Sequence, residues 1–128
     1  MAMTNPYARY KETAIAIARP EELVLMCYRG LAQYARQAAE AVGARDIPAA
    51  HQALVRAQDI CTYLRTTVDT RYEIGERLDA LYEYMYNRLV EANLSKASEP
   101  IEEVLALAED LRDTWAAAIR AGKEGEQG

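Results

Sequence analysis

The sequence predicts an all-α fold, an antiparallel up-down four-helix bundle with a short N-terminal arm docked on it. Apolar residues recur at alternating spacings of three and four along most of the chain, which is the period of helices packed side by side. Prolines at positions 20, 48 and 100 each stand near the start of such a stretch, where a helix tolerates proline because its first N–H groups have no helical partner. No strand-like alternation of apolar and polar residues competes, so we expect four helices joined by short connections.

The first two helices have recognisable ends. We expect the first to run from about Pro20 to Val42 and to stop at Gly43, a residue suited to a left-handed C-cap. The second starts near Asp46, whose carboxylate can cap the N–H groups of the first turn and suits the positive end of the helix dipole. It fades through residues 66–69. Its apolar positions keep the period without a miss: Ile47, Ala50, Leu54, Ala57, Cys61, Leu64 and Val68.

The last two helices follow the same period. We expect the third over about residues 73–94 and the fourth over about residues 99–120. The final residues, AGKEGEQG at 121–128, contain three glycines and no apolar anchor, which indicates a disordered tail. The chain therefore divides into an arm (1–19), a bundle (20–120) and this tail.

Composition argues against several classes of function. The 128 residues carry 15 Lys and Arg against 20 Asp and Glu, a net charge of −5 without a basic run, which argues against nucleic-acid binding. The longest apolar run, Leu23–Tyr28, is far shorter than the roughly 20 residues of a membrane span, and the first residues lack a signal-peptide pattern. Cys27 and Cys61 lie among apolar neighbours, which indicates reduced core thiols and a cytoplasmic protein.

Residues suited to catalysis or metal binding are sparse. The single histidine, His51, lies off the apolar seam of the second helix, and we interpret it as a solvated side chain. The two cysteines lie on different helices without a ligand cluster, and the sequence has no glycine-rich phosphate loop, so we expect no enzyme, no metal and no cofactor. One enzymatic alternative stays open, a small helical mutase that clamps an anionic substrate with buried arginines. Its candidates are Arg36, Arg56, Arg65 and Arg88.

Two further features indicate binding surfaces. In the arm, Tyr7 and Tyr10 share one face if the segment is helical, and residues 1–19 carry a net +2 that suits docking on a body of −7; a frayed terminus is the alternative. In the bundle, the first helix is apolar nearly all round over Leu23–Tyr28, and the third carries extra apolar side chains. Either these helices are central and touch two neighbours, or they leave a groove open for a partner helix. The extra residues of the third helix are Tyr82, Tyr84, Tyr86 and Val90.

Four strings of the sequence resemble one known family. NPYARYKETAI, RPEELVLMCYRG, AQDI and LYEYMYNRLVEANL occur in the order and spacing of the flagellar secretion chaperone FliS family, over about residues 5–119. The resemblance implies a cytosolic, non-catalytic four-helix bundle that binds the C-terminal segment of flagellin, prevents its premature polymerisation and delivers it to the flagellar type III export apparatus. It also implies contacts with the export gate and, in some species, with regulatory or co-chaperone proteins.

The resemblance extends to site residues. Tyr7 and Tyr10 match arm residues that cover part of the hydrophobic client site in the free chaperone and are displaced on binding. A general helical adaptor or regulator, binding another amphipathic segment, would share the fold and is the alternative function. Arg71–Tyr72 stands where the family often has a glycine pair, and the stiffer turn makes domain swapping a hypothesis that light scattering would test. The candidate client contacts are seam-adjacent residues of the second and third helices: Ile60, Leu64, Val68, Leu78, Tyr82 and Met85.

Overall fold

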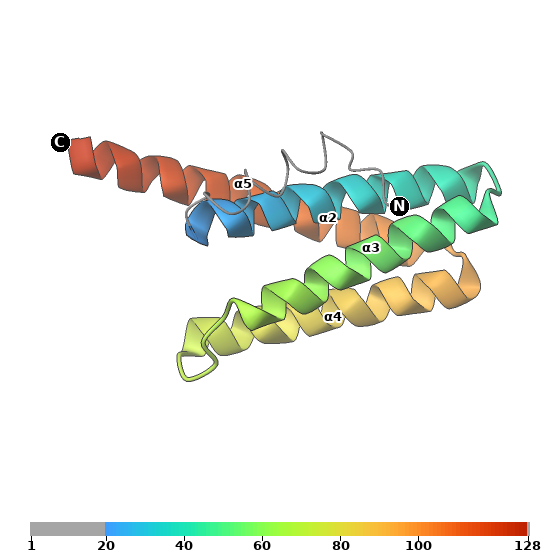
Figure 1. The fold of residues 1–128 in the computed structure, drawn as a ribbon, viewed down its shortest axis with the longest axis horizontal. Helices are drawn as coiled ribbons and strands as arrows, with labels where there is room; N and C mark the ends of the chain where they lie inside the picture. Colours follow the sequence, from blue (N-terminus) through green and yellow to red (C-terminus); the bar gives the residue numbers. More distant parts are fainter. Residues whose placement is uncertain (1–19, 128) are drawn as a thin grey trace, which may run out of the picture.

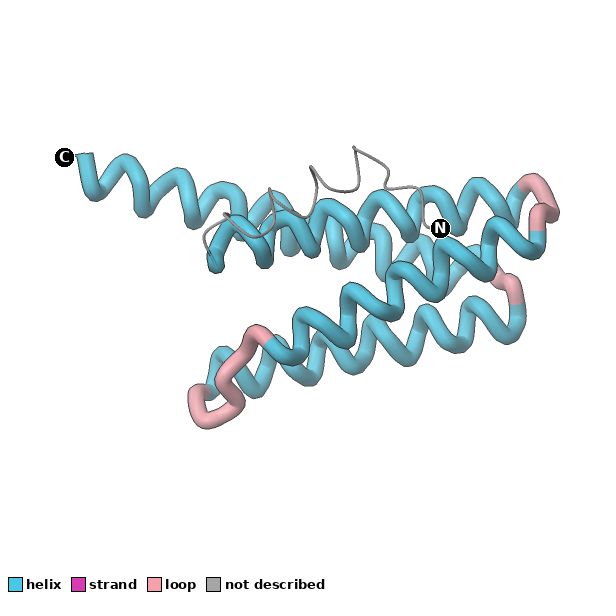
Figure 2. The backbone as a smooth tube through the Cα atoms, viewed as in Figure 1, coloured by secondary structure: helices cyan, strands magenta, loops and turns pink. Residues whose placement is uncertain are grey.

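Four helices make up residues 20–127, the part of the chain that the structure describes. In this computed structural model they run up and down as antiparallel neighbours joined by short connections, and no strand occurs among these residues (Figures 1 and 2). The predicted all-α four-helix fold is therefore confirmed, while the predicted arm with Tyr7 and Tyr10 lies outside the described residues. The helices are α2 (Pro20–Gly43), α3 (Ile47–Thr66), α4 (Glu73–Ser95) and α5 (Ser98–Gln127).

The turn between α2 and α3 differs from the prediction. Gly43 is the last helical residue of α2, and the left-handed residue is Arg45, with φ 60°. The N–H of Arg45 donates to the carbonyl oxygen of Val42 (3.1 Å) and the N–H of Asp46 donates to that of Ala41 (2.9 Å), which together form a Schellman motif. The prediction of a left-handed Gly43 is therefore wrong, because glycine also adopts helical angles at a cost of about 1 kcal/mol relative to alanine.

The start of α3 confirms the predicted cap, and the end of α5 differs from the prediction. Oδ1 of Asp46 accepts a hydrogen bond from the N–H of Ala49 (3.2 Å), and Pro48 stands in the first turn. At the other end of the chain, α5 continues to Gln127, so residues 121–127 are helical instead of a disordered tail. Alanine, lysine, glutamate and glutamine favour helix there, and single glycines weaken a helix without ending it.

The helices pack as two pairs that diverge at one end of the bundle. Each of α2 and α4 contacts both α3 and α5. In Figure 1, α2 lies beside α5 and α3 beside α4; the two pairs approach one another where the α2–α3 and α4–α5 connections lie, and spread apart toward the α3–α4 connection. We call these the closed end and the open end. The packing therefore places the start of α2, the end of α3 and the start of α4 around the same opening.

The core depends on small residues in α2. Ala32, Ala35 and Ala38 are at most 1% exposed and let neighbouring helices approach closely. Larger side chains fill the space between the helices. Within residues 20–127, no helix is long and apolar enough to cross a membrane. The large fully buried side chains include Tyr28, Leu31, Leu54, Leu64, Tyr82, Met85, Leu89 and Ile101.

Candidate functional site: a cleft at the open end of the bundle

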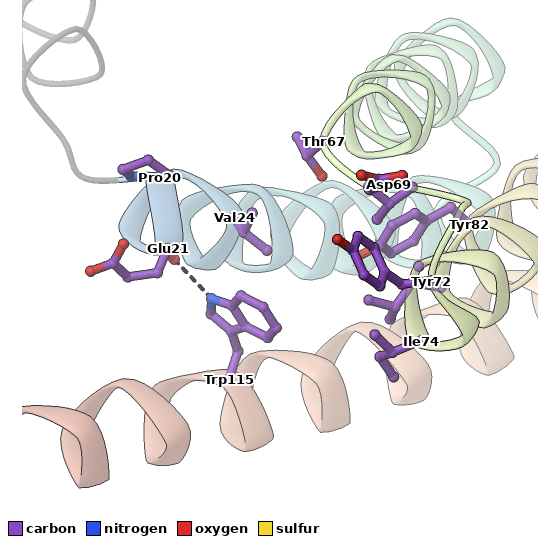
Figure 3. Close-up of a pocket in the computed structure, with 12 residues that line it drawn as sticks. Pro20, Glu21, Val24, Thr67, Asp69, Tyr72, Ile74, Tyr82 and Trp115 are labelled. Carbon is purple, nitrogen blue, oxygen red and sulfur yellow. Dashed lines mark hydrogen bonds between the residues drawn. The ribbon is translucent and has the colours of Figure 1, made fainter.

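A cleft of about 440 Å³ lies at the open end. The first turns of α2, the α3–α4 connection and the first turns of α4 form its walls, and Trp115 reaches toward it from α5 (Figure 3). The lining is mainly apolar, so the cleft suits an apolar group held by a few polar contacts. Its apolar side chains include Val24, Val68, Tyr72, Ile74, Leu78 and Trp115.

Asp69 and Gly75 fix the wall that the α3–α4 connection provides. The Asp69 carboxylate accepts hydrogen bonds from the guanidinium (2.7 Å) and the backbone N–H (3.0 Å) of Arg71, which lower the pKa of that carboxyl. The carbonyl oxygen of Asp69 accepts from the N–H of Tyr72 (3.2 Å). Gly75 is buried against the same carbonyl, since a Cβ at Gly75 would lie 2.0 Å from the Asp69 oxygen. This wall therefore requires glycine at position 75.

Two aromatic residues, Tyr82 and Trp115, line the cleft, and Tyr28 packs against both beneath it. The indole Nε1 of Trp115 donates to the carbonyl oxygen of Glu21 (2.8 Å; dashed in Figure 3), which joins α5 to the first turn of α2. Trp115 also packs edge-on against Tyr28, with ring centroids 6.0 Å apart. The hydroxyls of Tyr28 and Tyr82 form a 2.5 Å hydrogen bond that links α2 to α4. Burial raises the pKa of both phenols, so both hydroxyls keep their protons at neutral pH.

The mouth of the cleft carries two exposed apolar residues. Tyr72 is 64% exposed and Ile74 is 66% exposed, and both line the cleft. Their side chains gain little from folding because most of their surface stays in water. Covering them would remove further apolar surface from water, which favours the binding of an apolar partner.

The structure divides the six predicted client contacts into two groups. Val68, Leu78 and Tyr82 line the cleft, which brings three of the six together. Leu64 and Met85 are 0% exposed within the core, so a partner cannot touch them while the helices keep this packing. Both side chains face the inside of the bundle, so their contact with a client would require the helices to move apart.

Ile60 does not line the cleft, and four residues that do were not predicted. Ile60 is half-buried and packs against the core on the α2 side, with its Cδ1 3.1 Å from where a Cβ of Gly30 would lie. The prediction missed Tyr72 and Ile74, although two apolar residues flanking the first residue of a helix were a usable signal. It also missed Val24 and Trp115, because each continues the apolar period of its helix and gives no separate signal.

The geometry does not support the enzymatic alternative, a small mutase that clamps an anionic substrate with buried arginines. No charged side chain is buried within the described residues, and three of the four candidate arginines form ion pairs at the surface. Arg36 pairs with Glu109 (3.2 Å), Arg65 with Asp79 (2.8 Å) and Arg88 with Glu103 (2.8 Å), each between two helices. These arginines hold helices together and do not surround a site for an anion.

Histidine and cysteine side chains also form no site. The exposed His51 Nδ1 lies 2.9 Å from the amide nitrogen of Asn93, and no three metal-ligating side chains gather in the part of the chain that is described. Cys27 and Cys61 are free thiols. Burial raises the pKa of both, that of Cys61 to about 12, which makes them poor nucleophiles at neutral pH.

Comparisons with known proteins agree on one family. The family model described as "Flagellar protein FliS" matches residues 3–122. The flagellar secretion chaperone FliS of Bacillus subtilis is 35% identical over 128 residues, covering 100% of this chain and 96% of the relative. FliSB of Pseudomonas aeruginosa is 33% identical over 81% of this chain and 84% of its own length. FliS of Salmonella typhimurium is 32% identical over 81% of this chain and 79% of its own length.

Proposed function

Because this chain belongs to the FliS family of flagellar secretion chaperones, we propose that its client is the C-terminal segment of flagellin. The family gives the general role, a chaperone of flagellar secretion. The proposal adds that the protein works in the cytoplasm without catalysis, keeps flagellin from polymerising early, and delivers it to the flagellar type III export apparatus. Delivery includes a contact with the export gate and, in some species, with regulatory or co-chaperone proteins.

The cleft at the open end is the observation that carries this proposal. An amphipathic helix that lays its apolar face into a hydrophobic groove is a recurrent mode of peptide recognition. The cleft offers an apolar lining of about 440 Å³, and its mouth adds the exposed Tyr72 and Ile74. Val68, Leu78 and Tyr82 remain proposed client contacts in this cleft, and Ile60 is proposed to border it.

The N-terminal arm is proposed to compete with the client. Pro20 lines the cleft, so the 19 residues before it start at the edge of the site, and their net charge of +2 is opposite to that of the bundle. Tyr7 and Tyr10 are proposed to cover apolar surface of the cleft in the free protein. An arm that occupies the site 90% of the time would lower the apparent affinity about tenfold, or about 1.4 kcal/mol.

Calorimetric titration of a flagellin C-terminal peptide tests both proposals. The peptide is titrated into the full chain and into a chain that starts at Ala18, with an unrelated amphipathic helix as the control peptide. Specific binding that strengthens about tenfold on truncation supports the client and the competing arm. Unchanged binding overturns the arm's role alone. Equal binding of both peptides favours the adaptor alternative, and no binding overturns the client.

A pair of matched variants tests the location of the site. Burying most of Tyr72 and Ile74 on binding is worth about 1–2 kcal/mol each, so the double change to serine should weaken peptide binding about 30-fold or more. Leu94→Ser is the control, because Leu94 is 84% exposed near the end of α4, which lies at the closed end (Figure 1). Its binding should stay within about twofold of the original chain. Similar losses in both variants would place the site elsewhere.

A further inference from the structure

The buried stripes of α3 and α4 share one heptad register, although a turn separates the two helices. One series of stripe positions follows at intervals of seven residues from α3 into α4: Leu54, Cys61, Val68, Gly75, Tyr82 and Leu89. A second series, offset by three or four residues, runs from Ala57 to Ala92 and has Arg71 as its one polar member. Two helices that turn back on each other need no common register, whereas one continuous helix does. The register therefore fits a single helix over residues 47–95 as well as the observed hairpin.

The α3–α4 connection, residues 67–72, contains nothing that forbids a helix. It has neither glycine nor proline, and within the described residues positive φ occurs only at Arg45 and Lys96, which lie in the other two connections. Each of those connections is also followed by a proline, Pro48 or Pro100, in the first turn of the next helix. A proline there prevents a helix from running through the connection, because it lacks an N–H and its ring clashes with the carbonyl four residues back. Within residues 20–127, the α3–α4 connection is therefore the one that can straighten.

The turn leaves helical hydrogen bonds unmade. Among the described residues, the N–H groups of Val68, Asp69 and Thr70 have no backbone acceptor, and Tyr72 provides no side-chain cap for α4. A straight helix would give each N–H a carbonyl four residues back. The hydrogen bonds that the turn makes from Arg71 and Tyr72 to Asp69 would be lost in exchange. Straightening therefore exchanges one set of backbone hydrogen bonds for another.

We propose that the α3–α4 connection is a hinge for domain swapping between two copies of this chain. In the swapped dimer residues 47–95 form one helix, and α2 and α3 of each copy pack against α4 and α5 of the other. The contacts between α2 and α5 and between α3 and α4 form again across the two copies, while those between α2 and α3 and between α4 and α5 stay within one chain. The dimer needs no new surface, which is why swapping is a low-cost route to a dimer. The long side chain of Arg71 can extend to water from its place at the hinge.

The swap would remove the client site, and this step rests on the proposed function. Asp69 and Tyr72 line the cleft as part of a turn in which the Tyr72 N–H donates to the Asp69 carbonyl oxygen (3.2 Å). In a straight helix the same N–H would bond to the carbonyl of Val68, and the wall of the cleft would no longer exist. The client therefore binds the monomer, and the swapped dimer is a form without the cleft.

Gly75→Ala tests the hinge, because its effect depends on the path of the connection. An added Cβ meets the Asp69 carbonyl oxygen at 2.0 Å in the turn, whereas a straight helix carries that carbonyl away from position 75. Gly43→Ala is the matched control, since a Cβ there meets nothing within 4 Å. Each protein is unfolded in urea and refolded at low and at high protein concentration, and its molar mass is measured by light scattering.

The dimer fraction of the original chain should rise with the concentration during refolding. Gly75→Ala should raise the dimerisation constant at least about tenfold, because overpacking destabilises only the form that contains the turn. Gly43→Ala should match the original chain within about twofold. A monomer at every concentration, or equal dimer fractions in the two glycine variants, would overturn the proposal.

The unaltered sequence distinguishes a swapped dimer from any other dimer. The ring of Trp115 in α5 packs on that of Tyr28 in α2, with centroids 6.0 Å apart, and this contact lies between two chains only after a swap. Isotopically labelled and unlabelled copies are refolded together, the dimer is isolated, and nuclear Overhauser effects between labelled and unlabelled chains are recorded. We expect an effect between the two rings. Its absence from a stable dimer would overturn the swap.

Peptide titration then separates the swap from the proposed function. A peptide of the flagellin C-terminal segment is titrated into the isolated monomer and into the isolated dimer. Binding by the monomer alone is the expected result. Equal binding by the dimer overturns the loss of the site and leaves the swap in place, whereas no binding by the monomer overturns the proposed client.

Discussion

Replacing Gly75 with alanine would put a methyl carbon where the backbone of the α3–α4 connection already lies. The added Cβ would stand 2.0 Å from the carbonyl oxygen of Asp69 and 2.7 Å from its carbonyl carbon, against the 3.4 Å at which ordinary contact begins. No glycine in the described residues has a positive φ, so the angles at Gly75 are open to alanine. The clash alone therefore decides the outcome.

The structure sets the size of the effect. The atoms in the way belong to the backbone, so the connection itself has to move, and overpacking of this kind costs about 1–3 kcal/mol. Alanine recovers up to about 1 kcal/mol through its higher helix propensity. The Cβ would lie more than 1 Å closer to the Asp69 oxygen than ordinary contact allows, so we expect a cost near the upper end of about 1–3 kcal/mol. The net loss in the free energy of unfolding is then about 2 kcal/mol.

Urea unfolding followed by circular dichroism at 222 nm measures this loss. Gly43→Ala is the matched control, because Gly43 is also helical and a Cβ there meets nothing within 4 Å. Its stability should stay equal or rise by a few tenths of a kcal/mol, up to about 1. Equal or greater stability of Gly75→Ala would refute the close packing of the connection on α4. Because Gly75 and Asp69 both line the cleft, the same variant should also weaken peptide binding.

Three further predictions concern the core and the surface. Leu64→Ala should lower the free energy of unfolding by about 2–5 kcal/mol, since Leu64 is 0% exposed; a loss of peptide binding without a loss of stability would return it to the cleft. The thiol of Cys61, with a pKa raised to about 12, should react with Ellman's reagent only on unfolding, and modification at native rates would contradict its burial. Hydrogen bonds from Tyr84 and Arg88 lower the pKa of Glu103. The stabilisation that the ionised Glu103 carboxylate provides is therefore present above its unfolded pKa of about 4 and is lost as the pH falls through its lower pKa in the folded protein. Glu103→Gln should therefore reduce the acid-induced drop in the urea midpoint.

The fold could be predicted because its determinants are local. Helix caps and the apolar period act within a few residues, and both the Asp46 cap and the α-helical nature of all four segments are confirmed. The errors at Gly43 and beyond residue 120 have one cause. Glycine permits a helix end without requiring it, and the residues after it decide whether the helical hydrogen bonds continue.

The site could be predicted only in part, because the apolar period of a helix does not tell which of its side chains lie in the core and which line the cleft. The period gives the angle of a side chain around its helix, and Leu64, Val68, Leu78 and Met85 all satisfy it. Whether such a side chain is core or cleft depends on how closely the neighbouring helices approach it, and the helix pairs are close together in one part of the bundle and apart in another (Figure 1). Met85 lies about two turns farther into α4 than Leu78, whereas Leu64 lies in the last turn of α3 and is buried there by its contacts with the core.

Exposure alone does not identify a binding residue, as Leu94 demonstrates. Leu94 is more exposed than Tyr72 or Ile74, at 84% against 64% and 66%, and single exposed apolar side chains are ordinary on protein surfaces. The difference is that Tyr72 and Ile74 continue the apolar lining of a cleft. A partner that covers Leu94 gains the area of one side chain, whereas one that fills the cleft gains the area of several neighbouring apolar side chains. We therefore expect a partner to bind at the open end of the bundle.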